Sequence, residues 1–155
     1  MHVDGEGTIY EENPITTRTP VDRALPNLDG SSFLRGDFAD ILLYDGSSGI
    51  RSNGRDFFES LVNNPSSDEH DFRFNTNDSR FDETNVYFHI NRVHDYFTDN
   101  FNFTGRDRSF QVIVAHPAVD DRPGRILDRP VNNAFCSPFT QGSPSAVGQG
   151  AQAVG

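Results

Sequence analysis

The sequence has no lysine, a single cysteine and no long apolar run, and each absence excludes a class of protein. With Cys136 alone, no internal disulfide framework can form. No stretch reaches the roughly 18 apolar residues that a membrane-spanning helix needs, so we expect no membrane partner. The first residues have neither the basic nor the apolar region of a secretion signal. We therefore expect that such a signal was removed or that the chain comes from a longer gene product.

All 13 basic residues are arginines, and 23 acidic residues give the chain a net charge of -10. Arginine alternates with aspartate in Arg106-Asp107-Arg108, so no basic stripe develops. Binding to phosphates requires clustered basic side chains, and the composition therefore excludes a nucleic-acid partner. The acidity fits a solvated surface, with adaptation to salt or calcium binding as the alternatives.

Phenylalanine, present 14 times, supplies most of the candidate core, while 13 glycines and nine prolines predict short elements between turns. Apolar runs predict strands over residues 38–44 and 110–115, and a shorter strand begins near residues 7–10. Residues 117–130 have the composition of a charged, proline-bounded loop, and residues 131–135 that of a further strand. The predicted class is α+β, with short antiparallel strands packed against one main amphipathic helix.

That helix is predicted over about residues 82–100. Asp82 is a suitable N-cap, and Asp82 with Glu83 places negative charge at the positive end of the helix dipole. Apolar residues follow at spacings of four, three and four, which predicts one buried face made of Val86, Ile90, Val93 and Phe97.

Composition divides the chain into three segments. Residues 1–80 are rich in strands and turns, and residues 81–137 hold the helix and the later strands. Residues 138–155 consist mostly of Gly, Ser, Ala and Gln with little apolar bulk, as expected of a truncated or disordered tail.

Catalytic and metal-binding patterns are weak. A catalytic zinc helix carries histidines four apart with a glutamate beside the first, whereas His89 and His94 are five apart and about 140° from each other on a helix. We interpret both as packed or hydrogen-bonded helix residues. Cys136 with His116 as its base is an alternative nucleophile pair, against a thiol without chemical role. A calcium site is the alternative to a polar loop at the oxygen-rich cluster Asn75, Asn77, Asp78, Asp82 and Glu83.

Three stretches together resemble one family. Residues 81–105, which read FDETNVYFHINRVHDYFTDNFNFTG, resemble the long aromatic-rich helix in the N-terminal lobe of thermolysin-like and fungalysin-like zinc metallopeptidases. Residues 131–135 resemble the Asn-Asn-Ala-Phe edge strand of these enzymes, and residues 148–150 resemble the glycine-rich turn that follows it. Residues 25–30 and 34–36 also resemble segments that precede this lobe in bacterial relatives.

The resemblance implies half of a two-lobed fold from a secreted enzyme, with peptide or protein as substrate. By motif match, Asn133 would hold the substrate backbone through its amide, Ala134 would offer main-chain groups, and Phe135 would line the cleft, in the manner of strand addition. Zinc would belong to the missing C-terminal catalytic lobe, because its HExxH motif is absent here. The chain alone is therefore expected to be inactive. Cys136 departs from the family, in which an aromatic residue commonly follows the phenylalanine.

A second interpretation remains open. A non-catalytic, acidic, β-rich binding or adhesion module would also explain the charge, the many turns and the missing catalytic motif.

Overall fold

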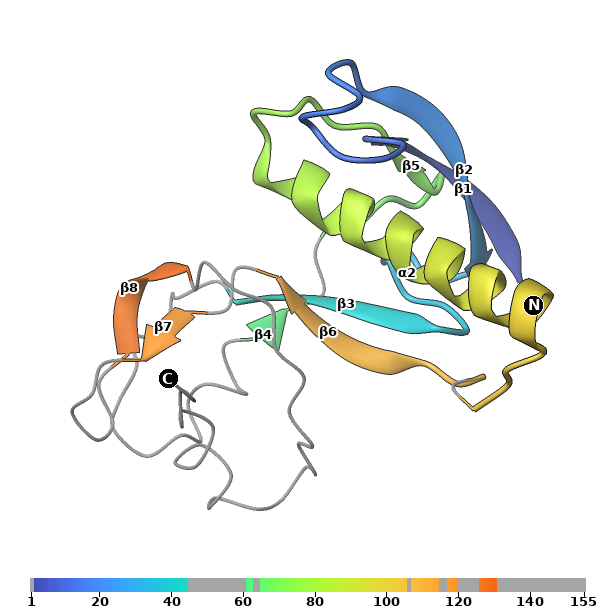
Figure 1. The fold of residues 1–155 in the computed structure, drawn as a ribbon. Coiled ribbons are helices and arrows are strands. Elements are labelled where there is room, and N and C mark those ends of the chain that lie inside the picture. The colour runs from blue at the N-terminus through green and yellow to red at the C-terminus, as the bar shows by residue number, and fades with distance from the viewer. Residues whose placement is uncertain are drawn as a thin grey trace, which may run out of the picture. The chain divides into compact units, whose positions relative to one another are not determined.

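The structure is a computed structural model, and it describes residues 2–44, 61–62, 65–105, 107–114, 117–119 and 126–130. The chain divides into two compact units, the first made of Met1–Leu43 with Asn63–Val114 and the second of Tyr44–Val62 with Ala115–Gly155. Strands and a long helix both occur among the described residues (Figure 1), which confirms the α+β class.

In the second unit, the described residues form β4 (Leu61–Val62), β7 (Pro117–Val119) and β8 (Ile126–Pro130). β7 and β8 pair antiparallel, and Pro117 lies opposite Pro130 at one end of the ladder. The expectation of a loop over residues 117–130 is therefore wrong for these two strands. Proline is compatible with them because it stands at a strand end, where the missing N–H costs little.

The first sheet of the first unit has the strand order β2-β1-β5. β1 (Val3–Ile9) pairs antiparallel with β2 (Val21–Leu28), while β5 (Asp71–Phe72) pairs with β1 in parallel. Pro26 is accommodated in β2 because this strand lies at the edge of the described sheet. A Cβ atom on Gly7 would meet Cγ2 of Thr84 at 2.5 Å, so a glycine is needed where the helix crosses β1.

Two predicted strands of the first unit are confirmed, but their pairing differs from the expectation. β3 (Ala39–Tyr44) and β6 (Phe110–Val114) pair in parallel, with Ala39 opposite Phe110 and Leu43 opposite Val114. Parallel neighbours need a long crossover, and the chain between these strands contains the helix that supplies one. The expected antiparallel arrangement therefore holds for β1 with β2 and for β7 with β8, and it is wrong for β1 with β5 and for β3 with β6.

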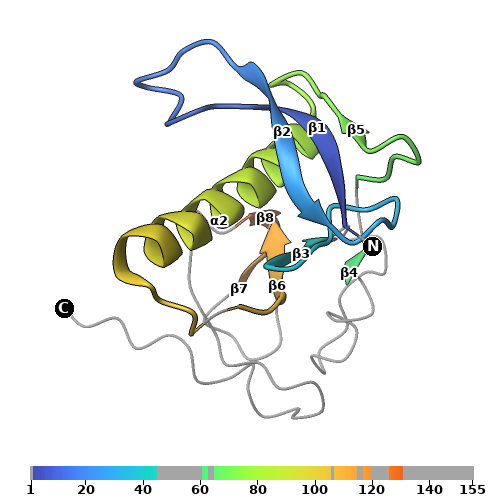
Figure 2. The same cartoon turned by 90° about the vertical axis from the view of Figure 1, so that its right-hand side faces the viewer.

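The helix α2 spans Ser79–Phe101 and packs against β1 and β2 (Figures 1 and 2). Its N-cap is Asp78 rather than Asp82: Asp78 has an extended backbone, and its Oδ1 accepts the N–H of Arg80 at 3.0 Å. The guanidinium of Arg80 also lies 2.6 Å from Asp78 Oδ2, and these hydrogen bonds lower the pKa of Asp78 to about 2. Asp82 instead lies in the first turn, where it complements the dipole.

Replacing Asp78 by alanine is expected to raise the equilibrium constant for unfolding roughly fivefold at neutral pH, because the helix loses its N-cap. Urea unfolding followed by circular dichroism measures this change. Asp82→Ala is the matched control, since it removes the same charge four residues later without removing a cap. A larger effect for Asp82→Ala than for Asp78→Ala would contradict the observed start of the helix.

The buried face of α2 differs from the predicted one. Val86 and Ile90 are half-buried against the core, whereas Val93 is 55% exposed and Phe97 46% exposed. The residues of α2 that are buried are Phe81, Glu83, Thr84, Tyr87 and Asn91. Two of the polar residues on this face make hydrogen bonds to the helix backbone: Thr84 Oγ1 donates to the carbonyl of Arg80 (3.1 Å), and Asn91 Nδ2 donates to that of Tyr87 (3.0 Å).

The core of the first unit lies between α2 and the strands. Its buried apolar residues are Leu25, Leu28, Leu34, Ala39, Ile41, Phe72 and Tyr87. Tyr87 is the largest of the fully buried side chains among the described residues, and its hydroxyl donates to the carbonyl of Pro26 at 2.8 Å. Among the described residues, no helix is both long enough and apolar enough to cross a membrane.

Candidate functional site

The residues predicted to contact substrate lie outside the described part of the chain. This applies to Asn133, Ala134 and Phe135, and also to the alternative nucleophile pair Cys136 and His116. These residues therefore remain predictions, and the candidate site is built from the described residues of the first unit.

The histidines of α2 are hydrogen-bonded, in agreement with their interpretation from spacing. His89 Nε2 lies 2.8 Å from the carbonyl oxygen of Tyr10. His94 contacts two carboxylates, with Nδ1 at 3.2 Å from Asp95 Oδ1 and Nε2 at 3.0 Å from Asp107 Oδ1. His89 therefore contacts the segment after β1, whereas His94 contacts the segment after the helix.

The oxygen-rich cluster before the helix is largely engaged in local structure. Asp78 caps the helix and holds Arg80, Glu83 is fully buried, and Asp82 is exposed. Within the described ranges, no three His, Cys, Asp or Glu side chains converge where they could hold a metal ion.

Four exposed aromatic side chains gather at the C-terminal end of α2 and just beyond it. We call Tyr96, Phe97, Phe101 and Phe103 the aromatic surface; they are 46% to 63% exposed. Their rings contact one another, with centroids 5.5 Å apart for Tyr96 and Phe97, 5.9 Å for Phe97 and Phe101, and 6.4 Å for Phe97 and Phe103. Exposed apolar groups gathered in this way mark interaction sites.

Local backbone geometry positions the aromatic surface. Asn102 adopts a left-handed conformation with φ of 49° and ends the helix, its N–H donating to the carbonyl of Thr98 at 2.9 Å. The chain then turns back, so that the N–H of Phe103 donates to the Phe97 carbonyl at 3.3 Å and Thr98 Oγ1 donates to the Phe103 carbonyl at 3.3 Å. A Cβ on Gly105 would meet the Phe103 ring at 2.6 Å, so glycine makes room for this ring.

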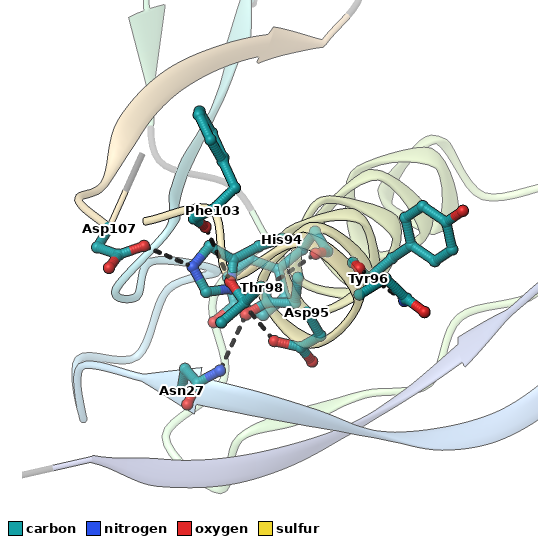
Figure 3. A network of polar contacts seen from close by, with 10 residues as sticks. Asn27, His94, Asp95, Tyr96, Thr98, Phe103 and Asp107 are labelled. Carbon is teal, nitrogen blue, oxygen red and sulfur yellow. Dashed lines mark hydrogen bonds and ion pairs between the residues drawn. The ribbon is translucent and has the colours of Figure 1, made fainter. Parts of the chain in front are cut away.

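His94 holds the segment that follows the helix through its contact with Asp107 (Figure 3). Its ring stacks on Phe38 with centroids 3.5 Å apart and an interplanar angle of 16°, and its two nitrogens face Asp95 and Asp107. Burial by itself lowers the pKa of His94, but the hydrogen bonds and charges of Asp107 and Asp95 outweigh it and raise the pKa above its ordinary value. Because both ring nitrogens are engaged, His94 is suited to holding structure rather than to proton transfer.

The sequence predicts only part of the arrangement around His94 and the aromatic surface. The recurrence of Tyr87, His94 and Phe101 every seven residues indicates a shared stripe, and Tyr87 is indeed buried. Phe101, however, is 63% exposed, and the contact of His94 with Asp107 spans 13 residues. Local periodicity cannot show such a contact, since it depends on the turn at Asn102.

Comparisons with known proteins leave the family open: no family model, no curated protein and no solved structure matches this chain.

Proposed function

We propose that this chain is the substrate-binding, N-terminal part of a secreted zinc metallopeptidase whose zinc ligands lie outside it. The observation that supports this proposal best is the aromatic surface, which is exposed at the end of α2. It lies in residues 81–105, the stretch whose sequence most resembles the N-terminal lobe of thermolysin-like and fungalysin-like enzymes.

The physical reason is the cost of leaving these rings in water. Each large aromatic side chain gains free energy when it is buried, and four mutually contacting rings form a patch that a partner surface can cover. In a two-lobed enzyme, the second lobe is such a partner. The cover would come from the C-terminal catalytic lobe of the same parent protein.

The two lobes would divide the work. The predicted edge strand with Asn133, Ala134 and Phe135 would pair with the peptide backbone and position the scissile bond. The catalytic lobe would supply the HExxH histidines and the glutamate base, and zinc bound there would provide the activated water. No residue described in this chain replaces those groups, so peptide hydrolysis would require both parts.

Reading the gene onward from the codon for Gly155 tests the proposal directly. We expect an in-frame HExxH within a few dozen codons, with a glutamate on a following helix as a further zinc ligand. The 155-residue chain incubated with zinc should show no chelator-sensitive peptide cleavage, and the longer product should show it. Chelator-sensitive cleavage by the short chain, or a stop codon directly after Gly155, would overturn the proposal; a stop codon would favour the acidic binding module.

A substitution in the longer product tests whether the predicted edge strand contributes to activity. Asn133→Ala in the longer product is expected to lower kcat/KM by about tenfold or more, since it removes a hydrogen bond to the substrate backbone. Asn132→Ala is the matched control, because it removes the neighbouring amide, to which the motif assigns no substrate contact.

A further inference from the structure

An open groove runs beside α2 where the chain leaves β1. The residues that line it and carry the argument are Glu11, Glu12, Arg92, Val93, Tyr96 and Phe97. One wall comes from the segment after β1 and carries two glutamates. The other wall comes from the helix and combines His89 and the cationic Arg92 with the apolar side chains of Val93, Tyr96 and Phe97. A groove of this composition suits a segment that is both apolar and positively charged.

Residues on the N-terminal side of the groove already hold a segment of the chain itself, which follows β1. Asn85 Oδ1 accepts the N–H of Tyr10 at 2.8 Å, and His89 Nε2 lies 2.8 Å from the carbonyl of Tyr10. One turn further on, the guanidinium of Arg92 donates to the carbonyl of Glu11. The side chains at positions 85, 89 and 92 lie on one stripe of the helix, so they keep the acidic wall in place.

The bound segment then leaves the helix. The side-chain oxygen of Asn13 accepts the N–H groups of Ile15 (3.0 Å) and Thr16 (2.9 Å), which turns the chain away. The same stripe continues to Val93 and Tyr96, which are 55% and 56% exposed. The surface on which the segment after β1 lies therefore continues along the helix, and the continuation at Val93 and Tyr96 is exposed.

The charges indicate which occupant fits. Glu11 is paired with Arg23 at 2.9 Å, and Arg92 is engaged with the Glu11 carbonyl. Glu12 is exposed and forms no ion pair with any described residue. A second copy of this chain would bring another net charge of -10, which opposes self-association.

We propose that this groove binds an extended peptide segment in which an arginine or lysine stands beside an apolar residue. The cation would lie over the Tyr96 ring with its charge toward Glu12, and the apolar side chain would pack on Val93 and Phe97. The proposal concerns this chain by itself, in which Tyr96 and Phe97 are exposed. In a two-lobed parent, the covering lobe and the peptide would compete for these two rings.

The test uses the full 155-residue chain and two synthetic peptides, N-acetyl-Leu-Arg-Phe-Arg-amide and the same peptide with citrulline in place of each arginine. Citrulline keeps the shape of arginine and removes its charge. We expect the arginine peptide to bind about fivefold more tightly at low salt, with the difference shrinking in about 0.5 M salt. In ¹⁵N-correlated spectra, the amides of Val93, Tyr96 and Phe97 should shift most. Equal affinities for the two peptides, or shifts centred elsewhere, would overturn the proposal.

Exposed residues allow variants that leave the fold intact. Glu12→Gln should reduce the preference for the arginine peptide over the citrulline peptide, and Tyr96→Ala should weaken the binding of both. Glu69→Gln is the matched control, because it removes the same charge from an exposed position outside the groove. An equal loss with Glu69→Gln would show attraction to the overall charge rather than a groove site, and would also overturn the proposal.

Discussion

Tyr87→Ala is expected to destabilise the first unit by about 3–5 kcal/mol, the usual cost of truncating a buried aromatic residue. Tyr87 is fully buried and belongs to the core between α2 and the strands. A Cβ on Gly36 would lie 2.4 Å from the Tyr87 hydroxyl, so the ring fills its space up to the neighbouring backbone. Since domains are stable by about 5–15 kcal/mol, this loss is a large share of the total. Urea unfolding followed by circular dichroism measures it.

Tyr87→Phe separates packing from hydrogen bonding. It keeps the ring but removes the donor to the Pro26 carbonyl, so we expect a cost of about 1–2 kcal/mol. A loss of less than about 1 kcal/mol for Tyr87→Ala would contradict the docking of α2 on this core.

The same residue predicts a loss of stability at alkaline pH. Burial raises the pKa of the Tyr87 phenol well above its ordinary value. The folded state therefore keeps a proton that the unfolded state releases above about pH 10. The contribution is fully present below that pH and is lost as the pH rises toward the folded-state pKa. Tyr87→Phe should remove this contribution to the loss of stability at alkaline pH.

The elements that the sequence predicts well are those whose signal is local. The apolar, β-branched runs at residues 38–44 and 110–115 form β3 and β6, because such side chains suit a half-buried strand. The helix is likewise where its periodicity and acidic start place it, although it begins at Ser79, a few residues before the predicted start. Competing caps explain the difference, since both Asp78 and Asp82 are good N-cap residues and only the tertiary structure selects between them.

Other features depend on contacts between distant residues and leave no local pattern. The buried face of α2 includes Thr84 and Asn91, which hydrophobicity assigns to the solvent side. Asn91 is accommodated because its side chain reaches Asn27 in β2 (3.2 Å) as well as the Tyr87 carbonyl. Phe97 and Phe101 lie outside this buried face and are 46% and 63% exposed. Hydrophobic periodicity assigns Phe97 to the buried face, so it could not predict the aromatic surface.

His94→Gln is expected to remove a pH-dependent part of the stability, on the order of 1 kcal/mol near pH 6, after allowance for the exposure of its carboxylate partners. Asp95 on the helix and Asp107 beyond it face the ring, and Phe38 stacks on it. Because these carboxylates raise the pKa of His94, the folded state binds the proton more tightly than the unfolded state. The contribution is fully present below about pH 6.5 and is lost as the pH rises through the folded-state pKa. Denaturation between pH 5.5 and about pH 8.5 measures this slope.

The carboxylates of Asp71 and Asp78 make stability depend on pH in the opposite direction, and they do so in a separate, acidic pH range. Hydrogen bonds from Arg73 and Arg80 lower the pKa values of Asp71 and Asp78, so their contribution is lost only as the pH falls below about 4. Asp107→Asn should therefore reduce the slope of stability against pH between pH 5.5 and about pH 8.5 without affecting the acid range, because it keeps the shape of the contact and removes one charge.

Since His94 also holds the segment that carries Phe103, His94→Gln should speed hydrogen exchange of the Phe103 amide. A slope that persists in His94→Gln would show that another group titrates in this range, and an unchanged exchange rate would show that the aromatic surface is held without His94.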